Sequence, residues 1–178
     1  EFRDPETGAH IMRMARYSAL IARKLGMNAH WQELLLKAAP MHDVGKLATP
    51  DHILLKPGRL TAEEFEVAKT HAALGRKAIE SAERRLGMRV RFLDVAKDMA
   101  CHHHEHWDGT GYPDGTRGTD IPIGARIVAI VEAYEELQSG DYAKSESSPA
   151  DAVRVILSNK GKLFCPEMTD AFVKALRG

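Results

Sequence analysis

The sequence has little cysteine, no net charge and no long apolar run, and each shortage excludes a class of protein. Its two cysteines, Cys101 and Cys165, form neither a CxxC pair nor a disulfide framework, so we expect a reducing, cytoplasmic setting. Lys plus Arg and Asp plus Glu both number 25, which leaves no bulk field to attract nucleic acid or an anionic membrane. No apolar run approaches the length of a membrane span, and no signal-peptide pattern is present.

The apolar content is nevertheless sufficient for one core. A chain of 178 residues with 44% hydrophobic residues fits a single compact domain over residues 1–178. The sequence opens Glu-Phe-Arg without an initiator Met, so we expect it to be a piece of a longer, multidomain protein.

The spacing of apolar residues predicts an all-α fold with about seven helices. One helix begins in a capping box at Thr61 and presents a stripe from Phe65 to Ile79 to the core. Residues 105–121 are rich in glycine and predict a loop. The expected helices cover residues 6–25, 31–41 with a kink at Pro40, 90–104 and 121–131, and two more begin at Pro149 and Pro166.

The stretch CHHHEHWDGTGYP, residues 101–113, contains four histidines within five positions. Such a run is often only an exposed polar turn, so a metal site there needs ligands from other segments. His42 and Asp43, in MHDVGK, offer a nitrogen and an oxygen ligand at a helix end. Gly45 permits a tight turn, and Lys46 lies just beyond to hold an anionic group.

Four further positions strengthen the interpretation as a metal site. Glu6 and His10 are four residues apart on one helical face, at the head of an apolar stripe. His71 falls on the buried side of its helix, where a satisfied core histidine is the alternative. Glu132 follows a nearly continuous apolar segment, and a buried carboxylate is costly unless a cation meets it. Together with His103 and His104, these residues favour a multinuclear centre.

The remaining histidines sit on less constrained segments, and we interpret them as surface residues or as supports of the ligands. They are His30, His52, His102 and His106.

Taken together, the motifs resemble the HD-GYP family, a branch of the HD phosphohydrolase superfamily. The matching stretches are ETGAHIMRMARYS (6–18), HDVGK (42–46), PDHILLKPGRLTAEEF (50–65), HHEHWDGTGYPDG (103–115) and IPIGARIVAI (121–130). The resemblance implies an all-helical domain whose metal centre hydrolyses cyclic di-GMP or a related cyclic dinucleotide in bacterial signalling.

The resemblance also assigns roles residue by residue. It implies two or three transition-metal ions, usually iron or manganese. Asp43 is the expected bridging ligand, and Lys46 is similar to the lysine beside the scissile phosphate. Gly111, Tyr112 and Pro113 lie on the loop that fits substrate, and the Gly109–Gly115 segment is the expected contact for a GGDEF-type partner. The implied metal ligands are Glu6, His10, His42, Asp43, His71, His103, His104 and Glu132.

The sequence departs from the family pattern at several positions. Glu132 and Glu135 stand where the family has Asp, the arginine expected near residues 139–142 is missing, and Cys165 replaces an Asp. The resulting hypotheses are a slow phosphodiesterase and, as the alternative, a degenerate module that binds nucleotide or a GGDEF-type partner. A nucleotide-monophosphate phosphohydrolase is disfavoured by the GYP loop.

Overall fold

The computed structural model of the chain describes residues 8–139 and 148–177. These residues form eight α-helices and no β-strand, which confirms the all-α prediction. The α-helices are α1 (Gly8–Lys24), α2 (Ala29–Ala38), α3 (Asp51–Leu54), α4 (Ala62–Leu86), α5 (Arg91–His102), α6 (Ile123–Ser139), α7 (Pro149–Ser158) and α8 (Pro166–Leu176). Short 3₁₀ turns lie at η1 (Ala39–Met41), η2 (Val44–Ala48) and η3 (Gly118–Asp120).

Several helix ends differ from the sequence prediction. Pro40 does not kink a continuous helix over 31–41, because α2 ends at Ala38 and the chain tightens into η1. The helix expected over 90–104 ends at His102. The helix expected over 121–131 runs on to Ser139, since its outer face becomes polar while its inner face stays buried. The short helix α3 was not predicted.

Local capping explains why several helices begin where they do. Thr61 and Glu64 form a complete capping box at the start of α4, as predicted. The side chain of Ser148 accepts a hydrogen bond from the backbone N–H of Asp151, at 3.2 Å. Pro149 and Pro166 stand at the first turns of α7 and α8, where a missing N–H costs nothing.

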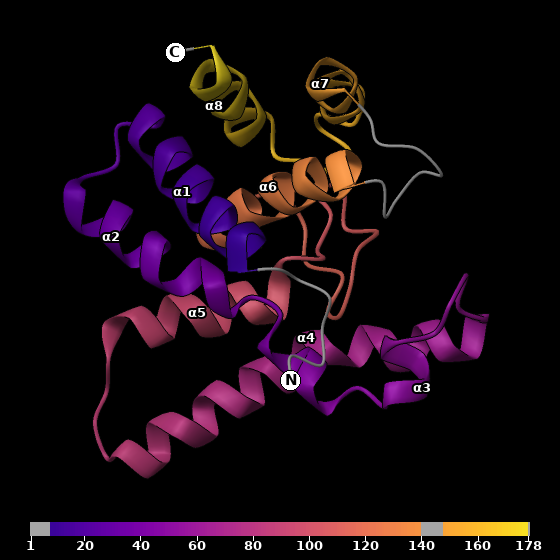
Figure 1. The fold of residues 1–178 in the computed structure, drawn as a ribbon. Coiled ribbons are helices and arrows are strands. Elements are labelled where there is room, and N and C mark those ends of the chain that lie inside the picture. Colours follow the sequence, from indigo (N-terminus) through magenta and orange to yellow (C-terminus); the bar gives the residue numbers. More distant parts are fainter. Residues whose placement is uncertain (1–7, 140–147, 178) are drawn as a thin grey trace.

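Helix α6 lies between two groups of helices (Figure 1). Helices α4 and α5 pack side by side at one end, and α7 and α8 pack on α6 at the other. Helix α1 packs against α2, α6 and α8, while α5 also contacts α2 and α6. The largest fully buried side chains include Met14, Ile21, Leu35, Met99, Ile127 and Phe172.

The turn η2 presses directly on the backbone of α4. A Cβ atom on Gly45 would lie 1.9 Å from the carbonyl oxygen of His71 and 2.5 Å from the amide nitrogen of Gly75. No side chain fits in that space, so glycine is required at position 45. The contact holds the His42-Asp43 turn against the helix that carries His71.

The outer end of the predicted α4 stripe is not buried. Ala72, Gly75 and Ile79 face the core, but Phe65 is 48% exposed, because it lies beyond the point where α5 covers the helix. Within the described ranges, no helix combines the length and apolar character that crossing a bilayer requires.

Candidate metal centre

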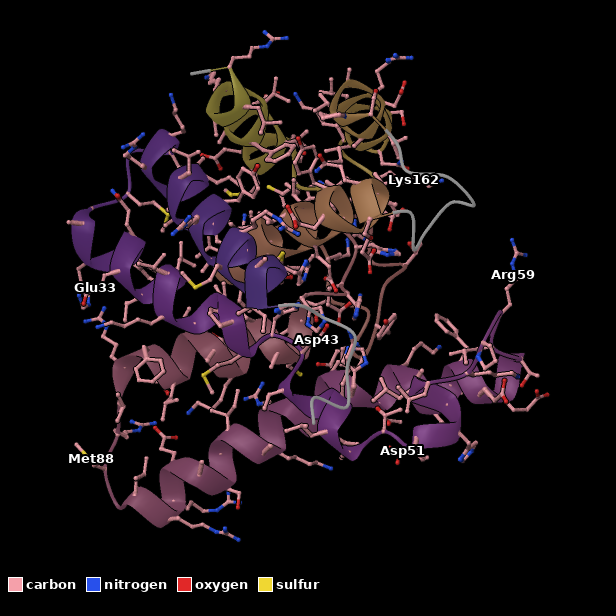
Figure 2. The ribbon with its side chains drawn as sticks, in the orientation of Figure 1. Glu33, Asp43, Asp51, Arg59, Met88 and Lys162 are labelled. Atoms are coloured by element: carbon pink, nitrogen blue, oxygen red, sulfur yellow. The ribbon has the colours of Figure 1, made fainter. Side chains whose placement is uncertain are left out.

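Ligand-type side chains from four segments meet inside the fold. His42 and Asp43 lie between η1 and η2, and His71 lies on α4. His103 and His104 follow the end of α5, and Glu132 lies on α6. Figure 2 places Asp43 in the middle of the molecule, among these segments. His42 is 1% exposed and His103 is 2% exposed, so the cluster lies inside the protein.

The first group of ligand atoms surrounds one oxygen of Asp43. Its Oδ1 lies 3.2 Å from Nε2 of His71 and 3.4 Å from Nε2 of His103. His104 completes this group, in which one ligand atom from each residue lies within 4.8 Å of every other. Such spacings suit ligands that share one ion.

The second group uses the other oxygen of the same carboxylate. Oδ2 of Asp43 lies 3.4 Å from Nε2 of His42, and Nε2 of His42 lies 4.0 Å from Oε1 of Glu132. These three residues again hold ligand atoms within 4.8 Å of one another. Asp43 therefore belongs to both groups, an arrangement that would suit a carboxylate shared by two cations.

The backbone fixes the orientation of three imidazoles. In each ring, Nδ1 lies at hydrogen-bonding distance from a carbonyl oxygen, so Nδ1–H donates and the Nε2 lone pair points into the cluster. The pairs are His42 with Ala39 (2.8 Å), His71 with Ala68 (2.7 Å) and His103 with Met99 (3.0 Å). Metal-binding histidines are commonly held in this way.

The electrostatics of the cluster also favour cations. Burial, together with the neighbouring imidazoles, lowers the pKa of His104 well below its usual range and lowers the pKa of His103, which favours the neutral form of both rings. Burial acts to raise the pKa of Asp43, but His42, His103 and His71 hold it well below the usual range. Burial and the Asp43 charge raise the pKa of Glu132 well above its usual range. A bound cation would offset the cost of burying the negative charge of Glu132 beside that of Asp43.

Lys46 reaches the same carboxylate from the solvent side. Its Nζ lies 2.5 Å from Oδ2 of Asp43, and its side chain is 28% exposed. The ammonium therefore stands at the rim of the cluster, between the buried ligands and the surface.

His10 is placed differently from the other predicted ligands. Its Nδ1 lies 3.5 Å from Oε2 of Glu135, and Nε of Arg13 lies 2.5 Å from the same oxygen. His10 belongs to neither of the two groups. The predicted ligand Glu6 lies outside the described residues. Sequence reasoning gave Glu135 no partner, although its position three residues after Glu132 puts both carboxylates on the same buried face of α6.

The GYP segment forms an aromatic wall beside the cluster. The ring of Tyr112 stacks on His104, with centroids 4.7 Å apart and an interplanar angle of 25°. Phe65 contacts the edge of Tyr112 at 6.4 Å, and Nζ of Lys69 lies 5.6 Å from the centroid of the Tyr112 ring. A Cβ on Gly111 would meet backbone atoms of residues 104–106 at 2.3–2.6 Å, so the segment packs closely against the histidine run.

The residues at the margins of the site differ in their solvent exposure. Pro113, His30 and His52 are exposed, and His106 is half-buried with Nδ1 3.0 Å from the Thr110 hydroxyl. The side chain of His102, in contrast, is only 11% exposed. Residues 140–142, part of the stretch that lacks the family arginine, lie outside the described residues.

Known proteins resemble this chain over nearly its whole length. The HD domain family profile matches residues 2–168 of the chain. A probable cyclic di-GMP phosphodiesterase of Vibrio cholerae is 42% identical over 97% of the chain, and a cyclic di-GMP phosphodiesterase of Thermotoga maritima is 39% identical over 98%. The chain spans only 41% and 46% of the lengths of these relatives.

Solved structures share the fold. An HDGYP protein from Bdellovibrio bacteriovorus has a TM-score of 0.70 at 22% identity, covering 95% of this chain and 52% of the other. The HD domain of the L. monocytogenes phosphodiesterase PgpH, solved with cyclic-di-AMP, has a TM-score of 0.63 at 18% identity, covering 99% and 93%. Because the family profile covers residues 2–168, the chain belongs to the HD domain family, and its HD and GYP segments meet at one centre.

Proposed function

We propose that the chain is a metal-dependent phosphodiesterase that hydrolyses a cyclic dinucleotide. The observation that carries this proposal is the buried Asp43 carboxylate, which is shared between two groups of histidine and carboxylate ligands. A two-cation site with an adjacent lysine is suited to water attack on a phosphodiester.

The ligand residues fit a pair of transition metals. His71, His103 and His104 with Asp43 would hold one ion, and His42 and Glu132 with Asp43 would hold the other. All the donors are nitrogen or oxygen, which suits iron or manganese, and we propose these metals. When bound, such a pair supplies Lewis-acid chemistry and lowers the pKa of water.

The chain's own residues account for charge and for orientation. Lys46 at the rim would place a positive charge on the phosphodiester oxygens, where negative charge develops. The carbonyls of Ala39, Ala68 and Met99 keep three of the imidazoles fixed, so these rings need not reorient during the reaction.

The substrate class follows from the relatives and from the aromatic wall. The curated relatives include proteins named cyclic di-GMP phosphodiesterase and proteins named 3'3'-cGAMP-specific phosphodiesterase. Tyr112 and Phe65, with Lys69 above both rings, form a surface suited to a purine base and its phosphate. We therefore propose cyclic di-GMP as the substrate, with the cyclic GMP–AMP dinucleotide as the alternative substrate.

A turnover assay with metal-loaded protein tests the proposal. Wild-type protein reconstituted with Mn²⁺ or, without oxygen, with Fe²⁺ should open cyclic di-GMP, as followed by chromatography of the products. Asp43→Ala should lose both metal and turnover, whereas the surface variant Lys37→Ala should keep both. Absence of hydrolysis of either dinucleotide by fully loaded protein contradicts the proposal.

A second candidate is a binding module without turnover, supported by Glu132, the longer acid where the resemblance implies Asp. In that role the Gly109–Gly115 segment, exposed at Pro113, would contact a GGDEF-type protein in the cytoplasm. Tight dinucleotide or GGDEF binding without hydrolysis by loaded protein favours this candidate.

A further inference from the structure

Another cluster of ligand-type residues lies at the end of α5, outside both groups of the candidate centre. Cys101, His102 and Asp114 bring one ligand atom each to within 4.8 Å of one another. Cys101 and His102 are the last two residues of α5, and Asp114 directly follows Pro113 in the GYP segment. The cluster thus joins the end of α5 to the loop that carries Tyr112.

The spacing within this cluster is that of ligands around an ion rather than of hydrogen-bonded partners. Nδ1 of His102 lies 3.8 Å from Oδ2 of Asp114 and 3.9 Å from Oε1 of Glu105. Both distances exceed the range of a hydrogen bond. Two ligands at about 2.0–2.1 Å from a tetrahedral ion lie about 3.4 Å apart, so a small closure would suffice.

Buried polar atoms at the cluster lack partners. Nδ1 of His102 is buried and has no hydrogen-bond partner. Glu105, whose side chain is fully buried, has the same deficit at Oε2, while its Oε1 accepts the backbone N–H of Asp114 at 2.8 Å. Buried polar groups without partners are costly, and an ion held by this cluster would satisfy Nδ1 of His102.

The groups around Cys101 act on its thiol in opposite directions. Burial raises the pKa of the Cys101 thiol, as do the charges of Asp114 and Glu105, while the adjacent Arg76 guanidinium acts to lower it. Arg76 is in turn paired with Glu80, with Nε 3.0 Å from Oε1. Two carboxylates, Glu105 and Asp114, face the same point and offset the charge of an entering dication.

We propose that Cys101, His102 and Asp114 bind a thiophilic divalent cation, with zinc as the natural occupant. A thiolate, an imidazole and a carboxylate are a zinc ligand set, whereas the candidate catalytic centre offers only nitrogen and oxygen. The ion would tie the GYP segment to α5 directly behind His103 and His104, and would leave a fourth position open to water.

Cobalt spectroscopy tests this site without any measurement of turnover, so its outcome is separate from that of the proposed function. Reduced protein preloaded with Mn²⁺ is titrated with Co²⁺. Cobalt bound to a thiolate gives a near-ultraviolet charge-transfer band, which nitrogen and oxygen ligands do not give. The expected result is such a band, which saturates at one equivalent and is abolished by stoichiometric Zn²⁺.

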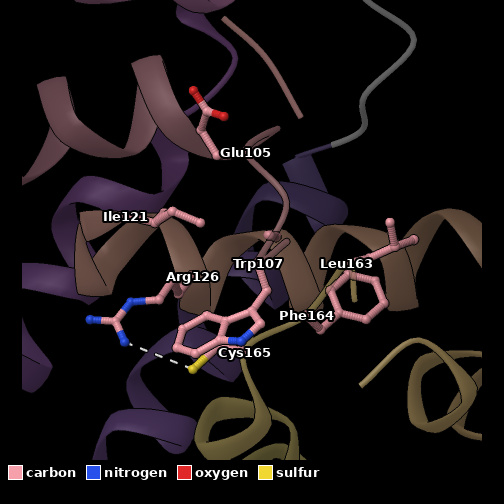
Figure 3. A pocket seen from close by; sticks show the side chains of 8 residues that line it. Glu105, Trp107, Ile121, Arg126, Leu163, Phe164 and Cys165 are labelled. Carbon is pink, nitrogen blue, oxygen red and sulfur yellow. Dashed lines mark hydrogen bonds between the residues drawn. The ribbon is translucent and has the colours of Figure 1, made fainter. Parts of the chain in front are cut away.

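Matched variants assign the band to its residues. Cys101→Ala should abolish it. Cys165→Ala should preserve it, because Cys165 is also buried and free but faces Arg126, whose Nη1 lies 3.8 Å from its Sγ (Figure 3). Asp114→Asn should weaken cobalt binding by at least about 10-fold, as expected for loss of a ligand. The side chain of Asp114 is 60% exposed, so this variant should fold even if Cys101→Ala does not.

The negative outcomes are equally definite. The exposed Asp120→Asn variant controls for loss of one negative charge from the same segment. The proposal is overturned if wild-type protein shows no thiolate band, if the band persists in Cys101→Ala, or if Asp114→Asn binds cobalt as tightly as Asp120→Asn.

Discussion

Nζ of Lys46 lies 2.5 Å from Oδ2 of Asp43, the carboxylate that both ligand groups share. The same oxygen faces Nε2 of His42 at 3.4 Å, which is the side where a second cation would bind. The lysine and that cation therefore compete for one oxygen. We expect metal loading to weaken the ion pair and to release the ammonium toward an incoming phosphate.

Replacement of Lys46 by Ala should slow turnover by about 10²-fold or more, as for loss of one contact to the developing charge. The metal content should stay at the wild-type level, because Lys46 contributes no ligand atom to either group. Steady-state kinetics and elemental analysis on one preparation check both points. Unchanged kinetics would assign Lys46 a structural role at the rim.

Removal of the shared carboxylate should cost more metal than removal of an unshared ligand. Asp43→Ala should lose both ions, whereas His104→Ala should lose the ion of its own group only, because His42 and Glu132 still hold the other. Bound metal stabilises the fold, so Asp43→Ala should also abolish the rise in melting temperature on metal addition. Elemental analysis measures the number of metal ions per chain in each variant. Equal losses in the two variants would argue against a bridging role.

The stability of the metal-free protein should depend on Glu132 in a pH-dependent way. Burial and Asp43 raise the pKa of Glu132 in the folded state, so the ionised carboxylate destabilises the fold. The stability that comes from protonated Glu132 is therefore fully present below pH 4.5, the ordinary pKa of a glutamate, and is lost as the pH rises through the raised pKa. At neutral pH, metal-free Glu132→Gln should therefore melt higher than wild type, by about 2–4 °C per kcal/mol.

The difference should vanish below pH 4.5, where Glu132 is protonated in both states. Excess Mn²⁺ should reverse the order, because the amide is a poorer ligand. Thermal melts with a chelator and with metal check this. A metal-free Gln variant that melts lower than wild type at neutral pH would contradict the burial argument.

Shortening the same side chain tests the departure from the family pattern. Glu132→Asp should raise turnover, by up to about 10²-fold if the extra methylene displaces the centre by near 1 Å. The number of bound metals should change by no more than one. If the rate stays flat and Glu132→Ala retains all the metal, Glu132 is not a ligand.

Tyr112 should act through its ring. Tyr112→Phe preserves the stacking on His104 and should keep dinucleotide affinity within a few-fold, whereas Tyr112→Ala should weaken binding by about 1–3 kcal/mol. Calorimetry with metal-loaded protein measures both. If neither nucleotide affinity nor binding to a GGDEF-type protein changes in Tyr112→Ala, the segment is only a connector.

The sequence was sufficient to predict the helical class from local signals, and the cluster around Asp43 from local signals together with the motif resemblance. Helical spacing and the capping box at Thr61 are short-range patterns. His71 was correctly expected on a buried face. The motif resemblance supplied the correspondence between distant segments, which spacing alone does not give.

The features that escaped prediction depend on tertiary contacts. The pairing of Glu135 with His10 and Arg13 joins α6 to α1, and Arg13 and Glu135 are 122 residues apart in the sequence. The group of Cys101, His102 and Asp114 forms only because the GYP segment folds back on the end of α5. Phe65 was assigned to the core because periodicity identifies a face of a helix but not how far a neighbouring helix covers it.

The absence of a side chain at position 45 determines how easily the centre can be lost. An alanine there would drive its methyl group into the carbonyl oxygen of His71, so η2 and α4 would have to separate. The turn that carries Asp43 would move with η2, and the two ligand groups would come apart. A one-carbon change at a residue without any chemistry of its own would thus inactivate the centre as completely as removal of a ligand, and a genetic screen for loss of function should recover it.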